Sequence, residues 1–278
     1  MQKKKSSVTR PRGRPKAFYD KTDQNTVQAL DRGLRLLSLL SMKPGLSLSE
    51  IADESGQAVS TVFRVLTTLQ GHALVEVEEP GQFWHVGSGA FRIGTAFLRR
   101  TKVVERARQP MDVLMRETGE TANLGIEAGD EVLFLGQVET HQMIRAFFPP
   151  GTKAPMHVSG IGKALLAWYP EEKVRHILRR SGMASFTDNS HITEASLLQD
   201  LVEIRSRGFA IDNEERAVGM RCIAAPIFNS YSEPIAGLSI SGPAFRMEMK
   251  DSHMIGRLVM EAATRVTGAT GGVVPQSI

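Results

Sequence analysis

The sequence predicts an α+β protein of two domains, the second built on an antiparallel sheet with flanking helices. Three observations support this. A chain of 278 residues is long for one domain. Apolar residues recur at helical spacing through most of residues 26–70. From residue 103 onward, strand-like runs alternate with helical ones, and no 20–50-residue repeat is present. Because 41% of the residues are apolar, both domains can form ordinary cores.

The N-terminal domain is predicted over residues 26–88 as a winged helix-turn-helix. Ser47 followed by Glu50 indicates a capping box at the start of a short helix, and Ser55-Gly56 forms the turn after it. Three helices and a hairpin follow from the periodicity, the helices over 26–40, 47–54 and 58–70 and the hairpin over 74–86. This order of elements is typical of DNA-reading domains.

The third helix is the candidate DNA-reading element. Ser60, Thr61 and Arg64 are expected to point away from its apolar face, and Gln57 lies near its start. Side chains of these types bind base edges and phosphates in the major groove. The alternative interpretation is an ordinary polar helix surface.

A basic arm precedes this domain. Residues 1–21 hold eight basic residues and one aspartate, a net charge of +7, so the rest of the chain carries −3. The arm, residues 1–25, is predicted to be disordered in isolation. Its segment from Arg12 through Arg14 to Pro15 resembles the core of an AT-hook, in which arginines enter a narrow minor groove. A tail that only contacts phosphates is the alternative.

A linking helix is predicted over 89–102, and the C-terminal domain over 103–278. Its helices are expected at 103–117, 161–168, 171–180, 194–208 and 250–267. Its strands are expected at 121–127, 131–139, 142–148, 208–212, 222–228 and 235–241.

The first part of a candidate pocket is a helix start at Ser159, Gly160 and Ile161. Free backbone N–H groups and the positive end of the helix dipole favour an anion there. The segment is not a P-loop, because His157 and Ala164 occupy positions that require Gly and Ser or Thr. A small carboxylate fits it better than a nucleotide.

The second part comes from three predicted strands. Asp212 follows one strand and Cys222 begins the next, while Ser239 and Ser241 share one face of the last. Two buried hydroxyls on one face need partners, which a polar ligand supplies. Taken singly, Asp212 is equally compatible with a turn cap and Cys222 with a small buried core residue.

The cysteine count and the lengths of the apolar runs limit the class of protein that the sequence can encode. A single cysteine excludes internal disulfides and indicates a reducing, cytoplasmic setting. No apolar run is long enough to span a membrane, and no motif indicates a cofactor or metal site. The expected partners are therefore double-stranded DNA and a small ligand.

These motifs resemble the IclR family of bacterial transcriptional regulators over roughly residues 26–270. The most specific segments are Ser60–Arg64, Gly162–Leu166 and Asp212–Pro226. The resemblance implies a GAF-like effector-binding domain and homodimers or dimers of dimers. It extends to the glyoxylate-sensing branch, the allantoin-pathway repressors and the regulators of the β-hydroxyaspartate cycle. The effector contacts of that branch fall here on Ser159, Gly160, Ile161, Asp212, Cys222, Ser239 and Ser241. Val59 stands where many relatives carry a polar or basic residue, so their base preference does not transfer.

The sequence therefore predicts a DNA-binding regulator rather than an enzyme, controlled by a small 2-oxo acid with glyoxylate as the first candidate. Pyruvate or another small carboxylate is an alternative effector. An enzyme with Cys222 as nucleophile is a weaker alternative, because no motif supplies a histidine base. An architectural protein acting through its arm alone is the third.

Overall fold

The computed structural model describes residues 26–275 except residues 44, 81 and 101. The predicted arm, with Arg12 and Arg14, lies outside the described residues. The chain divides between residues 99 and 100 into two compact units. Among the described helices, none is both long and apolar enough to cross a membrane.

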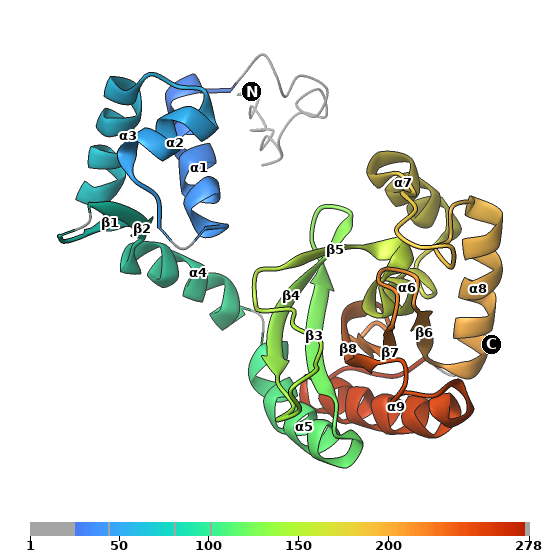
Figure 1. Cartoon of the computed structure of the whole chain (residues 1–278). Coiled ribbons are helices and arrows are strands. Elements are labelled where there is room, and N and C mark those ends of the chain that lie inside the picture. Colours follow the sequence, from blue (N-terminus) through green and yellow to red (C-terminus); the bar gives the residue numbers. More distant parts are fainter. Residues whose placement is uncertain (1–25, 44, 81, 101, 276–278) are drawn as a thin grey trace, which may run out of the picture. The chain divides into compact units, whose positions relative to one another are not determined.

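The described residues of the first unit form three helices and an antiparallel hairpin, followed by a fourth helix (Figure 1). Its elements are α1 (Gln28–Ser41), α2 (Leu48–Ser55), α3 (Val59–Gly71), β1 (Val75–Glu78), β2 (Phe83–Val86) and α4 (Ser88–Arg100). The predicted winged helix-turn-helix is therefore confirmed.

Local chemistry fixes the turn between α2 and α3. The Ser47 side chain accepts from the Glu50 N–H, and the Glu50 carboxylate accepts from the Ser47 N–H at 2.8 Å, so the predicted capping box is present. Gly56 ends α2 at φ 63°, a left-handed conformation that favours glycine. One apolar core joins the helices to the hairpin; it includes Leu36, Leu40, Ile51, Val62, Leu66 and Trp84.

Part of the apolar stripe predicted along α1 lies outside this core. Leu36 and Leu40 are buried, whereas Leu30 and Leu34 are 62% and 54% exposed. Helical spacing identified the helix correctly, but it did not reveal that a second apolar face remains uncovered within the unit.

The second unit is a six-stranded sheet between two layers of helices. Its longer helices are α5 (Val103–Thr118), α6 (Gly160–Leu166), α7 (Glu171–Ser181), α8 (Glu194–Arg207) and α9 (Ser252–Ala269). Its strands are β3 (Thr121–Glu127), β4 (Glu131–Val138), β5 (Lys153–Pro155), β6 (Ala210–Asn213), β7 (Met220–Phe228) and β8 (Pro234–Pro243). The order is β5-β4-β3-β8-β7-β6 with every pair antiparallel, as predicted.

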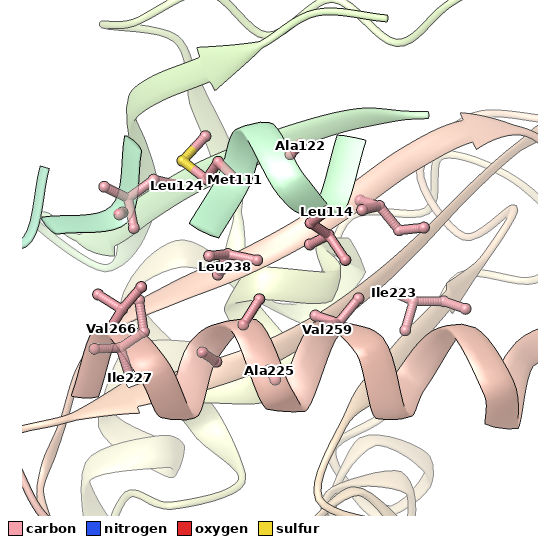
Figure 2. Close-up of a cluster of buried hydrophobic side chains, with 14 of the residues drawn as sticks. Met111, Leu114, Ala122, Leu124, Ile223, Ala225, Ile227, Leu238, Val259 and Val266 are labelled. Carbon is pink, nitrogen blue, oxygen red and sulfur yellow. The ribbon is translucent and has the colours of Figure 1, made fainter. Parts of the chain in front are cut away.

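One face of the sheet is apolar and lies under α5 and α9. Figure 2 shows Met111 and Leu114 of α5 and Val259 and Val266 of α9 packed around Leu238 of the sheet. Because side chains alternate between faces along a strand, the neighbours of these sheet residues point toward α6 instead.

The prediction of a strand at 142–148 was wrong. This segment is irregular, and Met143 within it is 96% exposed. The edge of β4 that it would need is occupied by the following segment: Gly151 N–H donates to Phe134 O, and Lys153–Pro155 pairs with Glu131–Leu133. The other edge of β3 pairs with β8, so 142–148 has no free strand edge beside it.

Candidate functional site

The exposed side of α3 carries the candidate DNA-reading residues. Ser60 and Arg64, one helical turn apart, are exposed, while Val62 and Leu66 are buried and anchor the helix. Thr61 is half-buried and lines a groove between α1 and α3. The structure thus presents Ser60 and Arg64 at the surface, and Arg64 also lines the groove that Thr61 lines.

Two further residues on this face were missed from the sequence. Phe63 is 51% exposed and Thr67 is exposed, and both neighbour Ser60 or Arg64 at helical spacing. Gln57, before the helix, is half-buried, and its Oε1 is enclosed with no hydrogen-bond partner among the described residues. An exposed phenylalanine beside polar residues suits contact with a thymine methyl group.

In the second unit, the sheet face under α6 is polar although it is buried. Asp212, Cys222, Ser241 and Thr121 are direct cross-strand partners on β6, β7, β8 and β3, so their side chains form one row on this face. Asp212 is 8% exposed, Ser241 3% and Thr121 0%. Cys222 is enclosed by protein but retains some accessible surface.

A second row lies one step along the strands. Ser239 pairs with Asn123 across β8 and β3, and Gln137 follows on β4. Asn123 Nδ2 donates to Ser241 Oγ at 3.3 Å, and Gln137 Nε2 donates to Asn123 Oδ1 at 3.2 Å. The Ser239 hydroxyl is 0% exposed and has no hydrogen-bond partner among the described residues. A buried hydroxyl without a partner is costly, so Ser239 is a candidate position for binding another polar group.

The N-terminus of α6 lies directly on this polar face. A Cβ atom at Gly160 would come within 2.7 Å of Cys222 Sγ, so only glycine allows the approach. A Cβ atom at Gly162 would come even closer to the Met156 backbone oxygen. Ser159 Oγ accepts from the Gly162 N–H at 3.4 Å and caps the helix, and Ile161 is 0% exposed.

Asp212 combines a structural contact with an unusual charge state. Its Oδ1 accepts from the Glu215 N–H at 2.8 Å, which is the turn-capping role considered from the sequence. Burial, followed by the nearby charge of Glu215, raises the pKa of Asp212 to about 7, against the opposing effect of Lys163. The carboxyl group therefore exchanges its proton near neutral pH.

The Cys222 thiol remains protonated at neutral pH. Burial and the charge of Asp212 raise its pKa to about 12. The Ser241 and Ser239 hydroxyls and the Gly160 N–H lie near enough to favour the thiolate, although the Ser239 contact does not reach hydrogen-bond geometry. A reactive thiolate requires a depressed pKa, so this environment argues against an enzyme nucleophile.

A buried ion cluster supports the site from behind. Lys163 Nζ lies 2.6 Å from Asp200 Oδ2 and 2.5 Å from Glu215 Oε1, and His191 Nε2 lies 3.5 Å from the same Asp200 oxygen. His191, Asp200 and Glu215 are close enough together to hold a metal ion. The Lys163 ammonium group already supplies the cation that these two carboxylates need.

Arg216 is another residue that the sequence did not reveal. Its guanidinium group is attracted by Asp212 and Glu131, and its Nη1 is enclosed with no hydrogen-bond partner among the described residues. A half-buried guanidinium near Asp212 adds positive charge on this side of the unit.

All seven effector-site residues predicted from the sequence come from the start of α6 or the adjoining sheet face. The sequence missed Thr121, Asn123, Gln137 and Arg216. Thr121 and Asn123 are two residues apart on β3, the same spacing that drew attention to Ser239 and Ser241, so that signal was available.

A winged helix-turn-helix unit followed by an α+β unit with an enclosed polar face is typical of one-component transcriptional regulators. In this class, one chain carries both the DNA-binding domain and the sensing domain. Comparison with known families makes this specific. Residues 29–79 match the IclR helix-turn-helix domain, and residues 95–267 match the C-terminal domain of the bacterial transcriptional regulator IclR. The chain belongs to the IclR family and is a DNA-binding transcriptional regulator.

Individual relatives agree. The chain is 50% identical to the HTH-type transcriptional regulator BhcR of Paracoccus denitrificans, over 93% of this chain and 92% of the relative. It is 36% identical to the HTH-type transcriptional repressor AllR of Escherichia coli, over 94% and 97%. The crystal structure of Thermotoga maritima IclR superposes with a TM-score of 0.75 at 28% identity, covering 88% of this chain and all of that one. The relatives are regulators and not enzymes, which confirms that expectation.

Proposed function

We propose that this regulator changes its operator binding when a small 2-oxo acid, with glyoxylate as first candidate, occupies the polar face under α6. The observation that carries the proposal is Ser239, a fully buried hydroxyl that has no partner among the described residues and shares a sheet face with Asp212 and Cys222. A ligand with several oxygens in a small volume supplies the missing partner.

The charge around the face favours a carboxylate. The backbone N–H groups of Gly160 and Ile161 begin α6, and the Arg216 guanidinium is attracted toward Asp212. The carboxylate of the ligand is placed at these donors, and its carbonyl or hydrate oxygens at Ser239 and Ser241. Asp212 then bonds the remaining hydroxyl. Close packing of Gly160 on Cys222 and burial of Ile161 favour a very small ligand.

We propose that Ser60, Thr61 and Arg64 of α3, with Gln57, contact the operator, and that Arg12 and Arg14 add contacts from the arm. The working form is a homodimer or a dimer of dimers in the cytoplasm. Leu30 and Leu34 on α1, with Phe91 (73% exposed) on α4, offer apolar surface for such an assembly. Effector and operator are coupled only if the effector has different affinities for the DNA-bound and free conformations.

Calorimetric titration with glyoxylate, pyruvate and oxalate, followed by operator binding at saturating effector, tests the proposal. Saturable binding near one per subunit, with a change in operator affinity, is the expected result. Pyruvate binding in place of glyoxylate would assign the alternative effector. Absence of binding by all three would reject the 2-oxo acid.

A further inference from the structure

Cys222 faces the candidate effector, and the chain contains no other cysteine. Its thiol shares a sheet face with the unpartnered Ser239 hydroxyl, one diagonal step away across β7 and β8. Asp212 is its direct cross-strand partner on the other side. On one sheet face, a nucleophilic sulfur therefore lies between a proton acceptor on β6 and a hydroxyl on β8 that has no partner among the described residues.

We propose that the Cys222 thiol adds reversibly to the carbonyl carbon of an aldehyde effector, which the regulator then holds as a covalent hemithioacetal. This inference rests on the proposed function, because it requires a small 2-oxo acid on this face. Beyond the proposed function, this inference states that the effector is an aldehyde and that Cys222 Sγ binds it covalently.

The addition balances without an oxidant or a second reactant. Sulfur forms a bond to the aldehyde carbon while the carbonyl π bond breaks, and its electron pair moves to oxygen. The thiol proton passes to the Asp212 carboxylate and from there to the new alkoxide, which becomes a hydroxyl. Because burial holds the thiol in its protonated form, the step needs this base, and a raised carboxyl pKa makes Asp212 a stronger one than an exposed aspartate.

The surroundings fit the product. The new hydroxyl lies on the face that carries Ser239, whose hydroxyl has no partner among the described residues. The Gly160 N–H lies against the sulfur that forms the bond. A sensor needs no turnover, so one slow and reversible bond per subunit is sufficient. A thiol that is too unreactive for rapid catalysis can therefore still bind the effector.

The same chemistry explains how the site selects its ligand. Aldehydes add thiols more favourably than ketones do, since a ketone carbon carries a second carbon substituent. In pyruvate that substituent is a methyl group, which needs additional space near Cys222 Sγ, where even a Cβ atom at Gly160 would come within 2.7 Å. We expect removal of the sulfur to reduce the preference for glyoxylate over pyruvate by about tenfold or more, about 1.4 kcal/mol.

Carbon-13 NMR on the full-length protein tests the bond directly. With glyoxylate labelled at its aldehyde carbon, we expect a protein-bound resonance of an sp³ carbon attached to oxygen and sulfur, distinct from the free hydrate. With cysteine labelled at Cβ, a single resonance should shift from its thiol to its thioether position, because Cys222 is the only cysteine. Pyruvate and glycolate, which lacks a carbonyl group, should leave that resonance at its thiol position.

Calorimetry on Cys222→Ala supplies the second measurement, with circular dichroism showing that the variant is folded. The proposal expects weaker glyoxylate binding and little change for pyruvate. If wild type binds glyoxylate but shows only a hydrate carbon and an unshifted cysteine, the covalent bond is rejected while the proposed function stands. If wild type does not bind glyoxylate by calorimetry, the covalent bond is rejected, and if it also fails to bind pyruvate and oxalate, the proposed function is rejected with it.

Discussion

Lys163 Nζ lies 2.5 Å from Glu215 Oε1 inside the second unit, where the two side chains are 1% and 6% exposed. The same ammonium group donates to the Ile211 carbonyl at 2.7 Å. Ile211 directly precedes Asp212, and the Glu215 N–H donates to the Asp212 carboxylate. One charge on α6 therefore holds both ends of the segment that carries Asp212.

Replacing Lys163 with Met should destabilise the protein by about 3–5 kcal/mol, because the buried Glu215 carboxylate would lose the ammonium group 2.5 Å away, while Asp200 would keep only its contacts with His191 and Arg207. Urea unfolding measures the change. Arg116→Met is the matched control: Arg116 is 72% exposed and pairs with Asp112 in solvent, so its loss should cost about 0–1 kcal/mol. Equal losses in the two variants would contradict a buried, structural role for Lys163.

Arg64→Ala should weaken operator binding by roughly 10- to 100-fold, the effect of about 1–3 kcal/mol for a base or phosphate contact. Arg64 is exposed on α3 beside Ser60, so its truncation leaves the core intact. Fluorescence anisotropy with operator DNA measures the affinity, and calorimetry should show unchanged effector binding. Gln70→Ala, near the end of the same helix, is the control. Unaltered operator affinity in Arg64→Ala would mean that α3 does not read DNA through this residue.

Deleting residues 2–20 should weaken operator binding and flatten its dependence on salt. The deletion removes Arg12 and Arg14 with most of the basic charge of the arm. Each lost phosphate contact reduces the slope of log K against log salt by about 0.9. Operator titrations between low and physiological salt measure the slope. A slope equal to that of the full chain would show that the arm makes no phosphate contacts.

Effector affinity should fall as pH rises through about 7, because Asp212 loses its proton there and its charge then repels an anionic ligand. Asp212→Asn should lose this pH dependence, and calorimetry from pH 6 to 8 measures it in both proteins. The free energy of unfolding is expected to change with pH in the same direction. The folded-state pKa lies above the ordinary value of 3.8, so the contribution of Asp212 to stability is present at low pH and is lost as pH rises toward 7. A flat affinity profile in wild type would place the effector away from Asp212.

The sequence could predict the fold class because local signals agree with the fold. The Ser47–Glu50 capping box and the spacing of Ser239 and Ser241 are both readable from neighbouring residues. The prediction of a strand at 142–148 was wrong because residues 151–155 occupy the edge of β4 with which that strand would have to pair. The Lys163 cluster was missed for a similar reason. Its carboxylates, on Asp200 and Glu215, lie 37 and 52 residues further along the chain, and no short motif indicates which buried charges meet.

Ser239→Ala should separate ligand binding from folding. The Ser239 hydroxyl is buried without a partner among the described residues, so its removal should leave stability unchanged or raise it by about 1 kcal/mol. Effector affinity should nevertheless fall about tenfold, the loss of one good hydrogen bond. Urea unfolding and calorimetry measure the two effects.

Ser252→Ala is the matched control for this variant. Ser252 is also buried, but its hydroxyl donates to Met249 O at 2.7 Å, so the same truncation should lower stability and leave effector binding intact. If Ser239→Ala loses only effector affinity and Ser252→Ala loses only stability, the unpartnered hydroxyl binds the ligand and does not stabilise the fold. A loss of stability in Ser239→Ala, with unchanged effector affinity, would instead make Ser239 an ordinary core residue and remove the main support for placing the effector on this face.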